Sequence, residues 1–597
     1  METFVLILGQ DTRSKAVATA TSSAILEEYR NLYGGVVPFD ADHVPVPGGV
    51  CVAVKRSGAP SVLVHTASTP QHACVVFGTL ARNVDPAVEI VRAFEDGGAG
   101  SAAELDGCFC AVVIERRTET ATVFGDGAGQ RTARYAHGDG VVLVSPHDLA
   151  ICATGGVPAL PDEDALTSLS AIGWPIGDRP LLAGLRAVRP HQSLRVANSM
   201  SELSDLVRAP VPTRLDVATL MVETLSPQIA GGVLTAELSA GLDSRAALAA
   251  ALAAKAPSDI VAFSDGEPAS LDVRVAREVA RCAGVRFENA APATRDMGGL
   301  AAEIRALGWA ANGIGNAAYL TTNAPVDFAR APSRSLSGEG GEIFSGAYYP
   351  WSPVRSFVPE RDVDPVATMT AGLRPFGGAD ATERVRTMLA GALGRMGTGH
   401  DALDDFYLYE RFGVWNQKQR RVHGSLNRVS PFYGRRAIAA YRSRRAPRAA
   451  HATPHADLIR TYLPSCYGLP VNAQHRLPLR HGPAPLRLMQ RTLDLQAKVA
   501  RKVGAGMPVR QGARSLADAR SDAFLAVMAD GLLPTRLDAS DSVAAGLLGE
   551  AGVARLIGSA DTERLGALSV VDAYFAAARK LRAASRRIDA MPARKAA

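Results

Sequence analysis

Residues 233–252, VLTAELSAGLDSRAALAAAL, read as a strand, a short polar loop and a helix. Val233–Glu237 is apolar and β-branched, Ser239–Ser244 is small and polar, and the Ala-rich run that follows is a strong helix former. The same order returns with a strand at Ile260–Ser264 and a helix at Leu271–Ala283. Strands that alternate with helices predict a parallel sheet flanked by helices.

The first two hundred residues follow a different pattern, in which short strands are separated by Gly, Asp and Pro turns. The predicted strands are Phe4–Leu8, Cys51–Lys55, Ser61–Val64, Cys110–Glu115, Ala121–Phe124 and Gly140–Ser145. Asn, Ser and Pro residues interrupt both patterns near 196–212. We therefore predict an α/β protein with a sheet-rich unit at 1–205 and an alternating unit at 206–597.

Composition narrows the classes of function. Hydrophobic residues make up 47% and charged residues 21%, as in soluble globular proteins, and the net charge of +6 is small for a nucleic-acid binder of 597 residues. The seven cysteines are scattered, without the paired spacing of a zinc or redox site. Neither a signal peptide nor a run of about 18 apolar residues occurs. We expect a cytoplasmic protein that binds neither nucleic acid nor membranes.

The loop Ser239–Ser244 has the composition of an anion-binding site. The start of a helix offers free N–H groups and a positive dipole end, which suit a pyrophosphate group. Asp243 would repel phosphate unless Mg²⁺ lay between them, so its carboxylate predicts a metal-bridged nucleotide. The alternative is an ordinary turn in which Asp243 caps the helix. The residues predicted to hold the phosphates are Ser239, Gly241, Leu242, Asp243 and Ser244.

A second glycine-rich loop, with two carboxylates, occurs at 335–346, SLSGEGGEIFSG. Its glycines, Gly338 among them, allow the backbone to approach the phosphates closely. Glu339 and Glu342 could hold Mg²⁺ or orient a reacting amine. The alternative is a tight turn with solvated acids. The occurrence of both loops in this order, in an alternating α/β context, favours one nucleotide site built from the two.

The two loops and their spacing resemble the ATP-pyrophosphatase domain of the asparagine synthetase family, which includes β-lactam synthetases and lasso-peptide macrolactam cyclases. Similar family segments lie at Leu105–Phe109, Phe124–Gly127, Arg428–Phe432 and Lys502–Gly504. The resemblance implies an Ntn-amidohydrolase-like αββα sandwich, followed by an adenine nucleotide α hydrolase-like parallel sheet domain with a helical C-terminal region. It also implies that ATP and Mg²⁺ bind, with Asp243 and Glu342 as the metal ligands.

The resemblance further assigns catalytic roles. Lys502 would neutralise charge that develops on the acyl-adenylate, Glu339 would orient the amine, and Glu410 stands where a β-lactam synthetase has the glutamate of a Tyr-Glu pair. For Lys502 the alternative is a surface lysine, and for Glu410 it is an exposed helical glutamate. Asp272 follows the second predicted strand and could contact the nucleotide, but we expect it to be the N-cap of the helix Leu271–Ala283.

At three positions this sequence differs from the family pattern, and these differences indicate which member of the family it resembles most. Glu2 stands where glutamine-dependent members have a nucleophilic cysteine, so ammonia cannot be drawn from glutamine by the usual route. The first unit is then a structural remnant or a docking surface for the substrate. Ala240 replaces a loop glycine and Glu342 replaces an aspartate, and we expect both changes to preserve binding. The nitrogen nucleophile is therefore expected to be an amine on the substrate.

The segment Ile176–Leu182 and the chain length are more similar to those of lasso cyclases. In that interpretation the enzyme adenylates a side-chain carboxylate of a precursor peptide, and the N-terminal amine of the peptide closes a macrolactam. The implied partners are the precursor peptide, a leader peptidase and a leader-binding protein. The alternatives are a β-lactam synthetase-like cyclase of small molecules, an asparagine synthetase that uses free ammonia, and a catalytically dead scaffold that docks a peptide.

Overall fold

A computed structural model gives the structure of the chain. It describes residues 2–9, 11–32, 38–58, 63–81, 84–138, 140–207, 216–266, 268–290, 297–320, 335–344, 346, 348, 362–371, 373, 378–415, 428–443, 453–469, 524–525, 542–543, 545–549, 554, 556 and 561–589. Lys502, with the whole predicted segment Lys502–Gly504, lies outside the described residues.

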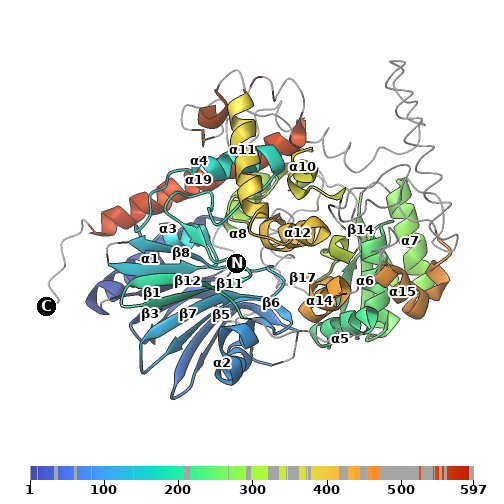
Figure 1. The fold of residues 1–597 in the computed structure, drawn as a ribbon, viewed down its shortest axis with the longest axis horizontal. Helices are drawn as coiled ribbons and strands as arrows, with labels where there is room; N and C mark the ends of the chain where they lie inside the picture. The colour runs from blue at the N-terminus through green and yellow to red at the C-terminus, as the bar shows by residue number, and fades with distance from the viewer. Residues whose placement is uncertain are drawn as a thin grey trace.

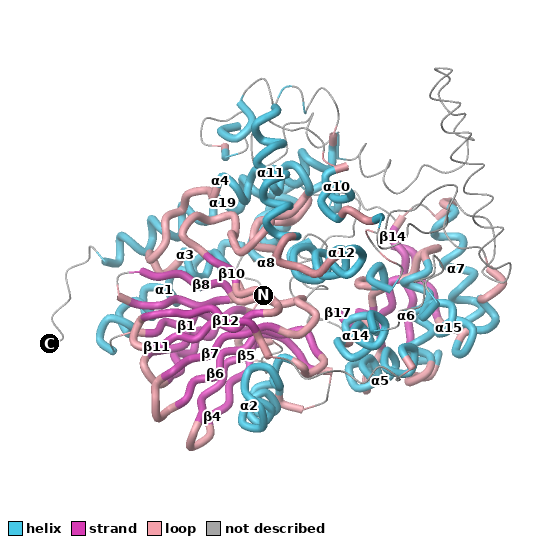
Figure 2. Tube along the Cα trace, in the orientation of Figure 1, coloured by secondary structure: helices cyan, strands magenta, loops and turns pink. Residues whose placement is uncertain are grey.

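Two six-stranded antiparallel sheets build the first half of the chain (Figures 1 and 2). The first has the order β10 (Arg186–Ala187), β8 (Arg134–Gly138), β9 (Val141–Ser145), β1 (Thr3–Leu8), β3 (Gly49–Arg56), β2 (Phe39–Val46). The second has the order β12 (Met200–Asp205), β11 (Gln192–Ala197), β7 (Thr120–Gly125), β6 (Gly107–Glu115), β5 (His72–Leu80), β4 (Val64–Ser68).

The two sheets pack face to face, with helices on the outside. Along β6, Val112 and Ile114 lie in the core between the sheets, whereas Ala111 and Val113 pack under α2 (Pro86–Ala103), because side chains alternate along a strand. Helix α1 (Asp11–Leu32) covers the outer face of the first sheet, and α19 (Thr562–Asp589) packs beside it. The layers follow the predicted order helix, sheet, sheet, helix.

The helix α19 packs against elements from the first part of the sequence. Its residues Tyr574 and Phe575 belong to the same core as the first sheet, and the Tyr574 hydroxyl donates a hydrogen bond to the buried Asp148 at 3.0 Å. Lys580 pairs with Glu28 of α1 at 2.6 Å. Part of the outer layer of the first unit therefore comes from residues beyond 560.

A five-stranded parallel sheet forms the second half, which confirms the alternating pattern (Figure 1). Its order is β15 (Arg286–Ala290), β14 (Ile260–Asp265), β13 (Leu234–Glu237), β16 (Ser335–Leu336), β17 (Arg428–Val429). The helices that pack around it are α5 (Val217–Ile229), α6 (Leu242–Leu252), α7 (Leu271–Ala283), α14 (Arg435–Ser443) and α15 (Thr453–Tyr462). Helix α7 has the predicted bounds, and α6 begins at Leu242, within the predicted loop Ser239–Ser244.

A further group of helices lies mostly above the antiparallel sheets in the view of Figure 1. Its members are α4 (Glu163–Ile172), α8 (Met297–Ala310), α10 (Pro365–Thr370), α11 (Gly378–Leu393), α12 (Gly399–Phe406) and the π-helix η4 (Tyr407–Phe412). Helices α4, α10, α11 and α12 share an apolar cluster that includes Trp174, Met369, Leu389 and Phe406, whereas α8 packs against α19 and α1. None of the helices among the described residues has the length and apolar character needed to cross a lipid bilayer.

Two local expectations need correction. Half of the strand predicted at Ser61–Val64, residues 61–62, lies outside the described residues; of the other half, Leu63 precedes the observed β4 and Val64 begins it. The polar residues Asn198 and Ser199 form the tight turn of the β11–β12 hairpin, where their φ angles of 50° and 61° lie in the left-handed region. The first part of the interruption near 196–212 is therefore a hairpin within the second sheet.

Candidate functional site

The first predicted loop lies between β13 and α6 at the carboxyl edge of the parallel sheet. The Ser239 and Ser244 hydroxyls are 2.9 Å apart, and the Gly241 N–H donates to Ser239 Oγ at 3.1 Å. Gly241 is the N-cap of α6 and provides no side-chain cap. The alternative in which Asp243 caps this helix is therefore wrong, because Asp243 lies within its first turn. A helix start without a side-chain cap can present N–H donors to a ligand.

Asp272, which lies in the first turn of α7, forms a hydrogen bond with the backbone of this loop. Its Oδ1 accepts a hydrogen bond from the Ala240 N–H at 2.8 Å. The N-cap of α7 is Ser270, whose Oγ accepts from the Val273 N–H at 3.3 Å, so the prediction that Asp272 caps this helix is wrong. The two loops meet because β13 and β14 are adjacent parallel strands whose carboxyl ends share one edge.

The second predicted loop packs directly on the start of α6, because β16 pairs with the other side of β13. A Cβ atom on Gly338 would lie 2.6 Å from the Ser244 nitrogen, and one on Gly341 would lie 2.6 Å from Asp243 Oδ1. These distances are too short for any side chain. Glycine at both positions therefore allows the two loops to form one surface.

Asp243 has a partner that the sequence analysis missed. The fully buried His455 of α15 places Nε2 2.8 Å from Asp243 Oδ1, and its ring stacks on Phe432 with centroids 4.9 Å apart. The Asp243 side chain keeps 38% of its surface exposed, so it remains accessible on its other side. No local motif surrounds His455, and its role depends on the packing of α15 against α6.

Glu339 is held in a network of charges at the end of the sheet. It pairs with Arg428 and accepts a hydrogen bond from the Tyr433 hydroxyl at 2.7 Å. Arg428 also binds both carboxylate oxygens of Glu237, at 2.8 and 2.7 Å. Burial raises the pKa of Glu339, although the guanidinium of Arg428 opposes this effect. The alternative of a solvated acid is wrong for Glu339, whose side chain is only 16% exposed.

Glu342 lies on the short helix η2 (Gly341–Phe344), directly after the glycine that abuts Asp243. Its Oε2 accepts a hydrogen bond from the Tyr407 hydroxyl at 3.0 Å. Burial and the neighbouring Glu342 raise the pKa of Tyr407 well above its usual value, so this hydroxyl stays protonated and donates. In the part of the chain that the structure describes, no group of three or more His, Cys, Asp or Glu side chains is arranged to hold a metal ion.

Glu410 has partners in the first half of the chain. It is buried on η4, pairs with Arg189, and accepts a hydrogen bond from the Gly177 N–H at 2.8 Å. The alternative of an exposed helical glutamate is therefore wrong. Its predicted catalytic role stays a prediction, and the observed contacts connect the two halves of the chain.

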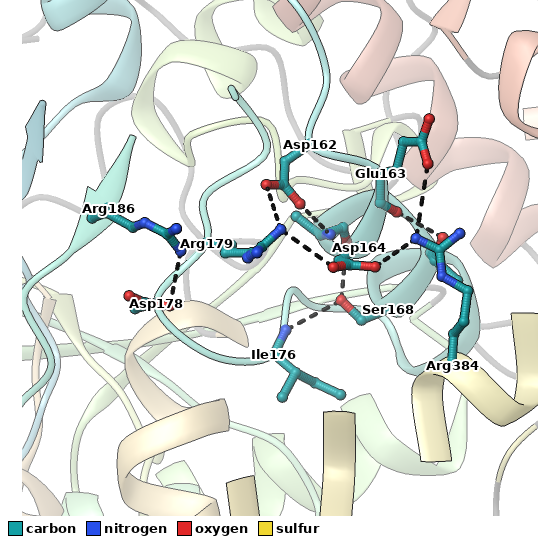
Figure 3. Close-up of polar contacts among 11 residues, drawn as sticks. Asp162, Glu163, Asp164, Ser168, Ile176, Asp178, Arg179, Arg186 and Arg384 are labelled. Carbon is teal, nitrogen blue, oxygen red and sulfur yellow. Dashed lines mark hydrogen bonds and ion pairs between the residues drawn. The ribbon is translucent and has the colours of Figure 1, made fainter. Parts of the chain in front are cut away.

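The segment after Gly177 continues this connection (Figure 3). Asp178 pairs with Arg186 at 3.3 Å, and Arg179 pairs with both Asp162 and Asp164 of the α4 start, at 3.4 and 3.2 Å. Arg384 of α11 approaches Asp164 from the other side at 2.6 Å. The charged residues of this family-like segment thus have a structural use, since they join α4 to the loop before β10.

Two other family-like segments also have structural roles. Asp126 is buried and accepts hydrogen bonds from four backbone N–H groups, at Phe109, Ala128, Gln130 and Arg131. Asp106 accepts one from the Thr224 hydroxyl at 3.2 Å and one from the Arg435 N–H at 3.1 Å, both in the second half of the chain. The first aspartate shapes a turn, and the second links the two units.

Glu2, at the position of the expected cysteine nucleophile, is an anchor. Its buried Oε2 accepts hydrogen bonds from the Leu63 and Val64 N–H groups at 2.7 and 3.2 Å. These contacts attach the start of β1 to the start of β4. A carboxylate bound in this way cannot replace a thiol nucleophile.

No family model matches the chain, and no characterised protein matches it in sequence. Among solved structures, the chain is similar to glutamine phosphoribosylpyrophosphate amidotransferase from B. subtilis, complexed with ADP and GMP, with 10% identity and a TM-score of 0.22 over 58% of this chain and 77% of that one. It is also similar to an allosteric regulatory enzyme of purine biosynthesis, with 12% identity and a TM-score of 0.20 over 49% and 66%. TM-scores this low support no conclusion about activity.

Proposed function

We propose that the chain is an AMP-forming carbon–nitrogen ligase of the asparagine synthetase type, which adenylates a carboxylate and transfers the acyl group to an amine. The observation that carries this proposal is the contact between the loop Ser239–Ser244 and the second, glycine-rich loop at the start of α6. Gly338 abuts Ser244 and Gly341 abuts Asp243, so helix N–H donors, hydroxyls and carboxylates gather within one turn of the helix. This combination suits a triphosphate that is bridged by a metal.

The residues at this site fit Mg²⁺. This ion is usually bound by one or two carboxylates, with water and substrate phosphates as its remaining ligands, so a larger protein cluster is not needed. Asp243, against which Gly341 packs, and Glu342, the next residue after Gly341, would hold it. When bound, it would neutralise charge on the phosphates.

The proposed reaction has two displacements. A carboxylate oxygen of the substrate attacks the α-phosphorus of ATP, and pyrophosphate leaves toward the start of α6, where Ser239, Gly241 and Ser244 would hold it. An amine nitrogen then attacks the acyl carbon, AMP leaves, and the amine loses a proton. Glu339, which Arg428 and Tyr433 hold in place, would orient that amine. Lys502 keeps its proposed role of neutralising charge on the acyl-adenylate.

Among such ligases, we favour one that closes a macrolactam in a lasso precursor peptide. Glu2 is fixed by backbone N–H groups where a glutaminase would need its thiol, which favours an amine supplied by the substrate itself. A leader peptidase and a leader-binding protein are the further partners that this proposal includes.

The test measures release of pyrophosphate and AMP with ATP, Mg²⁺ and a peptide that carries a free Asp or Glu side chain and a free N-terminus. Asp243→Ala should abolish release, whereas Asp259→Ala, which removes an exposed aspartate of the same fold unit, should leave it unchanged. Release of ADP and phosphate in place of AMP and pyrophosphate would refute the proposed mechanism.

A further inference from the structure

Tyr407 contacts the second loop from a position outside both predicted loops. It is the first residue of the π-helix η4, it is only 2% exposed, and its hydroxyl donates to Glu342 Oε2 at 3.0 Å. A phenol hydroxyl has a single proton to donate, so Tyr407 fixes one particular oxygen of this carboxylate. A buried tyrosine needs a partner for its hydroxyl wherever it lies, so the contact alone is compatible with a purely structural role. The surroundings of the ring add the information that is needed.

Packing holds the Tyr407 ring in one orientation. The ring stacks on Phe412, with centroids 5.6 Å apart, and meets Tyr348 edge to face at 5.9 Å. The Arg411 guanidinium carbon lies 5.4 Å from the ring centroid. The hydroxyl therefore has a fixed position before any ligand arrives. A glutamate has three side-chain torsions, and a fixed donor removes part of the conformational entropy that Glu342 would otherwise lose when it binds a ligand.

The π-helix that carries Tyr407 is itself anchored to the first half of the chain. Glu410, three residues after Tyr407, accepts a hydrogen bond from the Gly177 N–H at 2.8 Å and pairs with Arg189. π-Helices are rare and occur frequently at functional sites. Helix η4 therefore connects the first half of the chain to the Glu342 carboxylate, and Tyr407 is the residue that reaches this carboxylate.

We infer that Tyr407 is a positioning residue for the metal, because its hydroxyl holds Glu342 in the orientation in which this carboxylate, together with Asp243, would bind Mg²⁺. The inference rests on the proposed function and adds to its site a residue from outside the two loops. Removal of a group that orients a metal ligand typically lowers metal affinity by about 10- to 100-fold. We expect the lower end of this range, because Asp243 does not depend on Tyr407.

The binding test uses Mn²⁺ alone, which accepts the same oxygen ligands as Mg²⁺ and is followed through the EPR signal of the unbound ion. Tyr407→Phe keeps the ring and loses only the hydroxyl, so it should raise the Kd for Mn²⁺ by about tenfold. Tyr135→Phe is the matched control, because Tyr135 is also buried but lies on β8 of the first antiparallel sheet. The control should keep the wild-type Kd. The inference is overturned if Tyr407→Phe binds Mn²⁺ as tightly as the wild type, or if the wild type does not bind Mn²⁺.

A double-mutant cycle separates the hydrogen bond from a general disturbance of the core. Glu342→Asp keeps a carboxylate but shortens the side chain by one carbon–carbon bond of about 1.5 Å. From the same backbone position, the carboxylate then lies beyond hydrogen-bond distance of the Tyr407 hydroxyl, which now stands at 3.0 Å. Tyr407→Phe should therefore cause no further loss of Mn²⁺ affinity in the Glu342→Asp background. Two losses that multiply would contradict the proposed contact.

Activity measurements separate this inference from the proposed function. With the substrate peptide, Tyr407→Phe should raise the Mg²⁺ concentration that gives half-maximal pyrophosphate release by about tenfold and keep most of the rate at saturating Mg²⁺. Mn²⁺ binding that depends on Tyr407, without any pyrophosphate release, would refute the ligase and leave the role of Tyr407 intact. Pyrophosphate release with the same Mg²⁺ requirement in the wild type and in Tyr407→Phe would refute the role of Tyr407 alone.

Discussion

Replacement of Gly338 by alanine tests whether the two loops form one working site. The new Cβ would lie 2.6 Å from the Ser244 nitrogen, 2.8 Å from the Asp243 carbonyl carbon and 3.0 Å from Asp243 Cβ. An ordinary contact begins at 3.4 Å, so the second loop has to move away from α6 by about 0.8 Å. The nearest atoms belong to the backbone, which cannot rotate out of the way as a side chain end can.

The expected effects follow from that displacement. Overpacking of this size typically costs about 1–3 kcal/mol of unfolding free energy, which a protein of this length should survive. A misplacement of about 1 Å at a reacting centre can lower a rate by roughly 100-fold. We therefore expect Gly338→Ala to reduce peptide-dependent pyrophosphate release by about two orders of magnitude while the protein stays folded.

The assay compares initial rates of pyrophosphate release with urea unfolding curves for the same preparations. Gly391→Ala in α11 is the matched control, because a Cβ there meets no atom within 4 Å and the position is exposed. The control should keep the wild-type rate and lose no stability. If Gly338→Ala also keeps the wild-type rate, the contact between the loops is irrelevant to catalysis and the proposed site is wrong.

Three further predictions concern other parts of the molecule. Burial raises the pKa of Asp126 to about 6, from an ordinary value of 3.8. Protonation of Asp126 therefore stabilises the folded state by up to about 3 kcal/mol at low pH, and this contribution disappears as the pH rises through about 6. Asp126→Asn should remove that pH dependence from urea unfolding curves. Asp272→Ala should slow pyrophosphate release by roughly tenfold and change the free energy of unfolding by about 1 kcal/mol. Asp272→Asn keeps an acceptor oxygen and should therefore retain most of the rate. Equal rates in both variants would contradict the contact with the first loop. Glu410→Gln leaves the buried Arg189 without its carboxylate and should lower the free energy of unfolding in urea by about 3 kcal/mol. The loss should be smaller when Glu410→Gln is combined with Arg189→Gln. Loss of activity at unchanged stability would instead support a catalytic Glu410.

The parts of the fold that follow from local patterns could be predicted. The alternation after residue 216 predicted the parallel sheet, and the pattern of the run Leu271–Ala283 predicted the bounds of α7. The sheet order around β1, which pairs with β3 and β9, was not predictable, because those pairings join residues far apart in the sequence and any apolar strand satisfies them. The position of α19 was not predictable either, because its contacts with the first sheet also join residues far apart in the sequence.

The candidate site shows a similar division. The meeting of the two loops could be anticipated, since adjacent parallel strands end at one edge and glycine is the residue that permits close contact. The role of Asp272 was assigned wrongly because Ser270, two residues earlier, supplies an equally suitable cap and leaves the aspartate free to accept a distant N–H. His455 gave no signal at all, because a buried histidine on a helix is identified only by what packs against it.

The position of α19 has a consequence for how the polypeptide is made. The core that includes Tyr574 and Phe575 cannot be completed until the ribosome has translated α19, although β1 and α1 emerge more than 500 residues earlier. At roughly 5–20 residues per second, the interval between these events lasts from about half a minute to about two minutes. During it, the nascent chain carries uncovered apolar surface, so we expect chaperones to hold it, and a gene cut off before residue 560 should give an insoluble product.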